Sequence, residues 1–393
     1  MPAPAGSKGP IQPSLFRRPD REIEIAKRLW QGDLTPREAE EELRHHPAAL
    51  DTLSVETNMV CPLRCEYCYL NDRPATTSAS LDQVAGLLRQ AADAGVRRFA
   101  FVGKEPLADQ RAISLLGLLD ARNDRSRLQL GLVTNGIFAE RHVDRLSELR
   151  LDYLDVSVDG LALQNDVYRG RGSFDKAREA IRLFCQLPNS ALVVNSVLHR
   201  GNIGELHAFL DAMQDVGARH FSFAPVLDLT DSEAIAGMSL EPQKLFGPVW
   251  ESLESYARTS RTCQIMLDLS LGWTALALQK GRIRLDTVAR DARGVTYVKP
   301  QSGLPFFVKV QILPQDTWHW ARLTHDGYYL GRLRSTATRE YALGAAGDLI
   351  HVTFEQLFFR SLDERGWLAE EWERSVTWAS RVDLPISPIA VPS

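Results

Sequence analysis

The sequence predicts an α/β fold, a partial (β/α)6 TIM-like barrel followed by a C-terminal α+β appendage. Two observations support this fold class. Between residues 51 and 230, six short apolar stretches alternate with amphipathic segments of helical periodicity. Repeated strand–helix–strand units form a parallel sheet with the helices outside it. After residue 230 the alternation ends, and a long helix and a hairpin-like segment follow.

Six apolar stretches are expected to form the strands of the barrel. They are residues 52–58, 97–103, 128–135, 151–159, 191–198 and 220–226. The segments between them carry apolar residues at i, i+3 and i+4, which is the pattern of an amphipathic helix. These segments are residues 80–95, 110–123, 139–149, 173–187 and 203–217. Six units fall short of the eight of a full barrel, so we expect a partial one.

The domain organisation follows from composition and helix signals. Thr35 as N-cap, Pro36 at the first helical position and Glu38 closing a capping box predict a helix near the N-terminus. The first residues are Pro-rich and no apolar signal core follows them. The expected parts are a disordered leader at 1–20, a helical segment at 21–50, the barrel at 51–230, a helix and hairpin domain at 231–385 and a loose tail at 386–393.

The composition is that of a soluble globular protein, with 44% hydrophobic residues, 24% charged residues and a formal net charge of −4. This weak acidity gives no sign of binding to nucleic acid or to an anionic membrane surface. No apolar run approaches the roughly 20 residues that cross a bilayer. We therefore expect a cytoplasmic protein, in which thiols stay reduced. The odd count of five cysteines also argues against a disulfide framework.

Three of the five cysteines, Cys61, Cys65 and Cys68, lie within eight positions. Their spacing also fits one face of a helix, where they would be small core residues. However, Pro62 follows the first cysteine and loop-type residues frame the run, which favours a loop around a ligand. Structural zinc normally takes four protein ligands. A 4Fe–4S cubane also suits thiolates, and three cysteines would leave one iron open for a substrate or cofactor.

Small, polar and glycine residues follow the expected strands at the end where ligands bind in α/β folds. The cysteine loop follows the first strand, VGKEP the second and TNG the third. SVDG ends the fourth strand and APV the sixth. Each segment alone is compatible with ordinary turn chemistry. Together on one rim they indicate a cofactor site, since glycine lets the backbone approach a ligand closely.

The spacing C-x3-C-x2-C, with Tyr67 directly before the last cysteine, resembles that of the radical S-adenosylmethionine (SAM) superfamily. The resemblance covers residues 52–230 and implies that Cys61, Cys65 and Cys68 ligate one 4Fe–4S cluster. In that family the amino and carboxylate groups of SAM chelate the open iron. The cluster's electron then breaks the sulfur–C5′ bond. The resulting 5′-deoxyadenosyl radical abstracts a hydrogen atom from the substrate.

The strand-end motifs resemble the SAM-binding landmarks of the same family. GKEP looks like its Gly-Gly-Glu-Pro motif, which meets the SAM amino group. Gly103 and Glu105 match this motif, whereas Lys104 replaces the second glycine. The resemblance also places Asn135, in TNG, and Tyr67, in the cysteine motif, among the residues that bind the cofactor.

Three further SAM contacts are implied by the resemblance. SVDG is similar to the fourth-strand motif, in which Ser157 would meet the SAM carboxylate or ribose. NDVYRGRGSFDKA resembles the helix-entry segment of a branch whose members often carry an added SPASM or twitch domain. In that branch an arginine, here Arg169, pairs with the SAM carboxylate, for which a guanidinium fork is suited. VVNSVLHRGN places Asn195 near the ribose or adenine, and FAPV borders the adenine.

The region after residue 230 resembles the hairpin and helix of a SPASM or twitch domain. The expected elements are a helix at 240–260, strands at 306–313 and 318–334, and a helix at 352–368. Asp326-Gly327 indicates a tight hairpin turn. No cysteine lies beyond Cys263. We therefore expect a degenerate SPASM-like domain that lacks the cysteines for auxiliary clusters, and an unrelated hairpin appendage is the alternative.

The missing auxiliary cluster favours reactions that need no internal electron acceptor, such as epimerisation, rearrangement, elimination, group insertion or reduction. Cys263 is a candidate hydrogen donor, and an inert buried cysteine is the alternative. We expect a small-molecule natural-product intermediate as substrate, derived from a sugar, nucleoside or amino acid, and an external electron donor such as flavodoxin or ferredoxin. A ribosomally made peptide is the second candidate substrate. In another class, the chain is a non-catalytic iron–sulfur electron carrier or a zinc-stabilised binding module.

Overall fold

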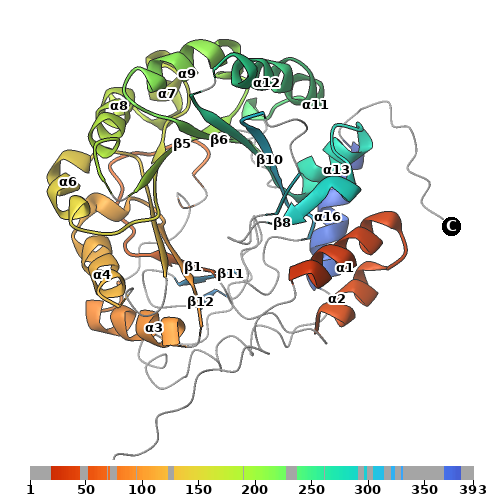
Figure 1. The fold of residues 1–393 in the computed structure, drawn as a ribbon, viewed down its shortest axis with the longest axis horizontal. Coiled ribbons are helices and arrows are strands. Elements are labelled where there is room, and N and C mark those ends of the chain that lie inside the picture. The colour runs from red at the N-terminus through yellow and green to blue at the C-terminus, as the bar shows by residue number, and fades with distance from the viewer. Residues whose placement is uncertain are drawn as a thin grey trace, which may run out of the picture.

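The strands form one 12-stranded sheet that curves around a central axis, with helices on its outer side (Figure 1). The computed structural model describes residues 19–44, 52–68, 70, 78–93, 95–122, 128–188, 190–226, 237–260, 262–290, 296–298, 304–313, 320–323, 329–330 and 367–381. The strand order is β12-β11-β1-β2-β3-β4-β5-β6-β7-β10-β9-β8. This arrangement is the partial barrel that the strand–helix alternation predicts.

The strands have the following bounds: β1 Thr52–Glu56, β2 Arg98–Val102, β3 Gln129–Thr134, β4 Tyr153–Ser157, β5 Ala191–Leu198, β6 His220–Pro225, β7 Gln264–Leu269, β8 Val288–Arg290, β9 Thr296–Val298, β10 Phe306–Val310, β11 Trp320–Leu323 and β12 Tyr329–Leu330. The first six correspond to the six predicted strands. Each pairs in parallel with the next. Their carboxyl ends therefore gather on one rim of the barrel.

The parallel sheet continues beyond the six predicted strands. β7 pairs in parallel with β6, and β10 pairs in parallel with β7. At the other edge, β11 pairs in parallel with β1. The boundary expected at residue 230 therefore does not interrupt the sheet. The physical reason is that β1 and β6 would otherwise expose rows of unpaired main-chain groups, which the later strands cover.

The predicted hairpin is part of this sheet rather than a separate appendage. β11 pairs antiparallel with β12, as the hairpin signal indicates. The turn at Asp326-Gly327, residues 352–366 of the helix expected at 352–368 and the tail at 386–393 lie outside the described residues, as do residues 1–18 of the leader.

The helices that follow the first five strands lie on the outer face of the barrel (Figure 1). Their bounds are α3 Leu81–Asp93, η2 Pro106–Ala108, α4 Arg111–Asp120, α6 Ala139–Ser147, α7 Ala162–Arg169, α8 Ser173–Phe184, η3 Ile203–Glu205 and α9 Leu206–Gln214. The later helices are α11 Pro242–Lys244, η4 Leu245–Val249, α12 Trp250–Thr259, α13 Leu271–Gln279, η5 Leu285–Thr287 and α16 Trp367–Arg381. Within the described ranges, every helix is too short or too polar to cross a membrane.

Two of these helical regions differ from the predictions. α7 is an additional helix between β4 and α8, and it carries the site residue Arg169 at its end. The long helix expected over 240–260 is interrupted at η4, where Gly247 has non-helical backbone angles and is followed by Pro248. Proline has no N–H to donate within a helix, and glycine adopts such backbone angles without a side-chain clash.

The N-terminal helices α1, Pro19–Gln31, and α2, Pro36–Arg44, pack against the C-terminal part of the chain. The capping box is confirmed. The Thr35 N–H donates to Glu38 Oε2 at 2.7 Å, and the Glu38 N–H donates to Thr35 Oγ1 at 3.3 Å. Trp30 Nε1 donates to the carbonyl oxygen of Ile312 at 2.8 Å, and its ring lies 4.3 Å from that of Trp372. The segment therefore joins distant parts of the sequence.

The strands alternate between a buried face and a more open one. In β2, Phe99 and Phe101 are buried, and in β4, Leu154 and Val156 are buried. The residues between them are partly exposed and point to the barrel lumen. Side chains in a strand alternate faces, so the buried set packs against the outer helices.

Candidate active site

The cysteine loop lies between β1 and α3, at the carboxyl end of β1. Cys61, Cys65 and Cys68 are free thiols, and each is partly buried. The Cys68 N–H donates to the Cys65 carbonyl oxygen at 3.1 Å. The Leu63 N–H donates to Cys61 Sγ at 3.4 Å. The run is thus a folded loop, as Pro62 and the flanking polar residues predict, and not a helix.

The three thiols fit a thiolate-ligated metal cluster. Burial raises the pKa of Cys61, and it raises the pKa of Cys65 to about 11. Other cysteines of the loop add to both shifts, so the sulfurs lie within electrostatic reach of one another. A bound metal cation lowers the pKa of a cysteine that ligates it, and so stabilises the thiolate. No three His, Cys, Asp or Glu side chains among the described residues surround a position for a single metal ion, whereas a cubane spreads its ligands over separate irons.

Glu105, which follows β2, organises the rim beside the cysteine loop. It is fully buried. Its carboxylate accepts hydrogen bonds from the Leu107 N–H at 2.9 Å, Thr134 Oγ1 at 2.7 Å and the Asn135 N–H at 2.7 Å. Burial raises the pKa of Glu105, and these three donors oppose that shift. The Glu105 carboxylate, which the resemblance assigns to the SAM amino group, therefore joins the ends of β2 and β3.

Gly103 and Asn135 lie on either side of Glu105 at this rim. Gly103 has a φ of +116°, and a Cβ there would lie 3.3 Å from Glu56 Cγ. Only glycine adopts this conformation readily, and the absence of a side chain lets the backbone pack closely against Glu56. Asn135 is buried, and its Nδ2 donates to Cys61 Sγ at 3.5 Å. The structure thus brings one predicted SAM residue against a predicted cluster ligand.

Arg169 is held by a carboxylate that the sequence reasoning missed. Its Nε and Nη2 donate to Asp159 at 2.7 and 3.1 Å. Asp159 is fully buried and also accepts from the Val197 N–H at 2.8 Å and from the hydroxyl of Tyr67. The Arg169 guanidinium stacks over the Tyr67 ring at 5.6 Å. Burial raises the pKa of Tyr67 well above its usual value, and the charge of Asp159 adds to that shift.

The guanidinium fork that the resemblance assigns to the SAM carboxylate binds Asp159 in this structure, and a fully buried carboxylate requires such a partner. The signal was visible in the sequence, since Asp159 is the third residue of SVDG. The position of Asp159 at a strand end does not indicate that Arg169, ten residues later, is its partner.

Ser157 and Asn195 lie side by side on neighbouring strands. They are register partners of β4 and β5. Both are partly exposed. The Val158 N–H donates to the carbonyl oxygen of Asn195 at 3.0 Å, which fixes the two strand ends against each other. The structure therefore brings together these two predicted SAM contacts at the carboxyl rim.

The lumen also contains charged residues that the sequence reasoning did not assign to a site. Register places Asp155, Asp268 and Lys309 on the same inner face as Asn195. Lys309 forms an ion pair with Asp268 of the adjacent strand. Burial raises the pKa of Asp155 to about 7, although the charge of Lys309 and a hydrogen bond from Asn195 oppose the shift. Barrel interiors are usually packed with aliphatic residues, so these charged groups make the inner face of the sheet unusually polar.

The placement of Cys263 contradicts the proposed hydrogen-donor role. It is buried, with 1% of its surface exposed, directly before the first residue of β7. Its Sγ lies 3.5 Å from Ser260 Oγ. Parallel strands gather their carboxyl ends on one rim, so the amino end of β7 lies at the opposite rim from the cysteine loop. Cys263 belongs to the hydrophobic core, which favours the alternative of an inert buried cysteine.

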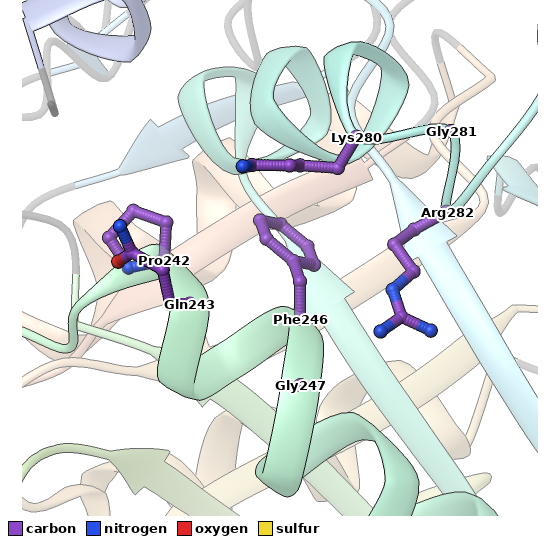
Figure 2. Close-up of a pocket in the computed structure, with 7 residues that line it drawn as sticks. All are labelled: Pro242, Gln243, Phe246, Gly247, Lys280, Gly281 and Arg282. Carbon is purple, nitrogen blue, oxygen red and sulfur yellow. The ribbon is translucent and has the colours of Figure 1, made fainter. Parts of the chain in front are cut away.

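A separate surface pocket of about 480 Å³ lies among the outer helices. Its lining residues come from α11, η4 and the turn that follows α13. Figure 2 shows the Phe246 ring between the side chains of Lys280 and Arg282. None of the strand-end residues lines this pocket. It is therefore distinct from the site around the cysteines.

Residues 55–213 match the family model of the radical SAM superfamily. This stretch is a radical SAM domain. It is 31% identical to a PqqA peptide cyclase of Methylorubrum populi over 183 residues, 45% of this chain and 46% of that protein. It is 28% identical to a GTP 3′,8-cyclase of Chlorobaculum tepidum over 186 residues, 46% of this chain and 55% of that protein. The chain thus spans about half the length of these curated relatives.

Solved structures of radical SAM enzymes share the fold. Streptococcus suis SuiB bound to S-adenosylmethionine superposes with a TM-score of 0.62 at 16% identity, covering 88% of this chain and 79% of SuiB. The structure of anSMEcpe with bound AdoMet gives a TM-score of 0.56 at 15% identity, covering 82% of this chain and 81% of that one. These likenesses confirm the predicted partial barrel. Radical SAM proteins use a 4Fe–4S cluster and SAM, and both of these neighbours contain SAM.

Proposed function

We propose that the chain is a radical SAM enzyme in which Cys61, Cys65 and Cys68 hold one 4Fe–4S cluster. When bound, the cluster supplies the electron that cleaves SAM reductively to a 5′-deoxyadenosyl radical, which abstracts hydrogen from the substrate. The observation that carries this proposal is the trio of partly buried thiols after β1 in a barrel of this family. Enzymes built on parallel barrels place their active sites at the same rim.

The groups that remain accessible at the rim are assigned to SAM. They are the backbone at Gly103 and the side chains of Ser157 and Asn195, all partly exposed. Glu105 and Arg169 are assigned a positioning role, because their charged groups bind the protein itself. Glu105 fixes the ends of β2 and β3, and Arg169 fixes the end of α7 against Asp159. Both act by preorganising the rim for the cofactor.

Electrons for the cluster are assigned to an external donor such as flavodoxin or ferredoxin, in a cytoplasmic setting. The two cysteines outside the loop do not suit an internal relay. Cys185 ends α8 on the outer side of the barrel, and Cys263 precedes β7 at the opposite rim. An enzyme without an internal acceptor suits net redox-neutral reactions or reductions of its substrate.

The substrate is proposed to present a polar group to the lumen, where Asp155, Asp268 and Lys309 lie. A small natural-product intermediate, derived from a sugar, nucleoside or amino acid, fits such a lining. A ribosomally made peptide is the second candidate, and the likeness to PqqA peptide cyclase and to SuiB favours it. Transfer of deuterium into 5′-deoxyadenosine from labelled candidates of each class distinguishes the two.

Alanine substitution of the three cysteines tests the proposed function. The wild-type protein, reconstituted anaerobically, is expected to hold about four irons per chain and to form 5′-deoxyadenosine from SAM and a reductant. Cys61→Ala, Cys65→Ala and Cys68→Ala should each reduce that product by at least about 100-fold, since each removes a ligand. Iron content and product are measured on the same samples.

Cys185→Ala is the matched control, because it removes a partly buried thiol far from the loop. It should retain both iron and product. SAM cleavage by the triple cysteine variant would refute the proposal. Iron without SAM cleavage in the wild type would favour an electron carrier, and zinc without iron would favour a binding module.

A further inference from the structure

Asn135 is buried directly after β3, and its side-chain amide bridges the rim and the cysteine loop. Its Oδ1 accepts a hydrogen bond from the Ile137 N–H at 3.0 Å. Its Nδ2 donates to Cys61 Sγ at 3.5 Å. An N–H of the main chain can only donate, so it must face the amide oxygen. The amide nitrogen is therefore fixed on the side of the sulfur.

Two neighbours hold Asn135 in this position. Its own N–H donates to the buried carboxylate of Glu105 at 2.7 Å. The next residue, Gly136, has a φ of +82°, and a Cβ there would lie 2.8 Å from Ala180 Cβ. The turn therefore packs closely against α8 and has no space for a side chain. The amide is a donor whose position is set before any cluster binds.

Cys61 receives a second hydrogen bond from the main chain. The Leu63 N–H donates to its Sγ at 3.4 Å. Two N–H groups thus converge on the sulfur of Cys61. Hydrogen-bond donors lower the cost of negative charge on such a ligand.

Hydrogen bonds to ligating sulfurs are one of the features that set the reduction potential of an iron–sulfur cluster. Reduction adds negative charge to the cluster and its sulfurs, so a donor stabilises the reduced state more than the oxidised one. We propose that Asn135 donates to the cluster ligand Cys61 and thereby raises the reduction potential of the 4Fe–4S cluster. This inference rests on the proposed function and makes Asn135 a positioning residue of the cluster rather than a contact of SAM.

The test is a potentiometric titration of the reconstituted full chain without SAM, followed by the EPR signal of the reduced cluster. Asn135→Leu keeps the shape of the side chain and removes the donor. Asn135→Asp keeps an acceptor for the Ile137 N–H and turns a carboxylate oxygen toward the sulfur. The midpoint potential should fall from wild type to Asn135→Leu and fall further in Asn135→Asp, with about four irons per chain in each.

Asn58→Leu is the matched control. Asn58 is buried beside the same loop, and its Oδ1 accepts from the Val60 N–H at 2.9 Å. Its Nδ2 donates to the carbonyl oxygen of Glu105 at 3.1 Å, and so to oxygen rather than sulfur. The variant should therefore titrate at the wild-type potential.

Three results would overturn the inference. These are equal potentials in wild type and both Asn135 variants, the same fall in Asn58→Leu, and loss of iron from both Asn135 variants while Asn58→Leu stays loaded. The last would make Asn135 a requirement for assembly instead of a determinant of potential. A wild-type protein that takes up no cluster would refute the proposed function instead, so the two failures are distinguishable.

Discussion

At the scale of single residues, the buried pair of Asp159 and Arg169 is the strongest electrostatic constraint of the site. The side chain of Asp159 is fully buried and that of Arg169 is 9% exposed. A bidentate pair in this setting compensates two desolvation costs at once. Because Tyr67 also donates to Asp159, the pair links the cysteine loop to α7. Its loss should therefore affect both stability and the order of the loop.

Asp159→Asn should lower the free energy of unfolding by about 3–5 kcal/mol, because it leaves the Arg169 charge buried and uncompensated. Denaturant unfolding of the cluster-free protein measures this. The double variant Asp159→Asn/Arg169→Met should recover most of the loss, since removal of both charges is often nearly neutral. A single variant as stable as the wild type would show that water, and not the carboxylate, compensates Arg169.

At the scale of elements, the packing of β3 against β4 depends on a small residue facing a large one. Gly131 and Tyr153 are register partners on the lumen side. A Cβ at Gly131 would lie 1.9 Å from Tyr153 Cζ, so the ring occupies the space that a side chain would need. The glycine therefore permits the ring to lie over β3, which a strand propensity alone would disfavour.

Gly131→Ala should destabilise the protein by about 1–3 kcal/mol, because the ring must leave its place or the strands must shift. Thermal or denaturant unfolding measures the change. Gly86→Ala is the matched control, since nothing lies within 4 Å of its Cβ position in α3, and it should stabilise the helix by up to about 1 kcal/mol. In combination with Tyr153→Leu, the cost of Gly131→Ala should fall; unchanged cost would exclude a clash with the ring.

At the scale of the whole molecule, extension of the sheet by late strands makes its inner face polar. β7 and β10 bring Asp268 and Lys309 to a space that β4 and β5 line with Asp155 and Asn195. The charge of Lys309, on β10, lowers the pKa of Asp155, on β4, although the two strands are far apart in sequence. The chemistry of the inner face is therefore a property of the extended sheet and not of any one motif.

Asp155 makes the stability of the fold depend on pH. Its pKa rises on folding from 3.8 to about 7, so the folded state binds more protons between these values. The free energy of unfolding should therefore decrease as the pH rises from about 4 to about 7. Asp155→Asn removes this term. Relative to the wild type, the variant should be more stable at pH 8 than at pH 5, as measured by denaturant unfolding.

Asp144→Asn, on the exposed side of α6, is the control for Asp155→Asn. It should stay within about 0.5 kcal/mol of the wild type at both pH values. A stability difference between wild type and Asp155→Asn that is the same at pH 5 and pH 8 would contradict the prediction. It would mean that the Asp155 carboxylate is solvated through the lumen.

Local signals of the sequence were enough for several features. The capping box at Thr35 and Glu38, the first six strands and the cysteine loop each depend on residues close in the chain. The partners of Glu105 and Arg169 could not be predicted in this way. Each lies on a different strand end or helix, and a motif indicates only that a charged group is present, not which group it will meet.

The sequence by itself determined the repeating α/β architecture, the rim at which the ligand-binding groups gather and the soft donor set of three thiols. These are consequences of periodicity, turn chemistry and the softness of sulfur, which act over short distances along the chain. Only the tertiary structure decided that Arg169 forms a bidentate ion pair with Asp159, that the Asn135 amide donates to Cys61, and that Cys263 lies at the rim opposite the cysteine loop. Burial requires each polar group to find a partner in three dimensions, and the folded sheet alone sets which partner is within reach.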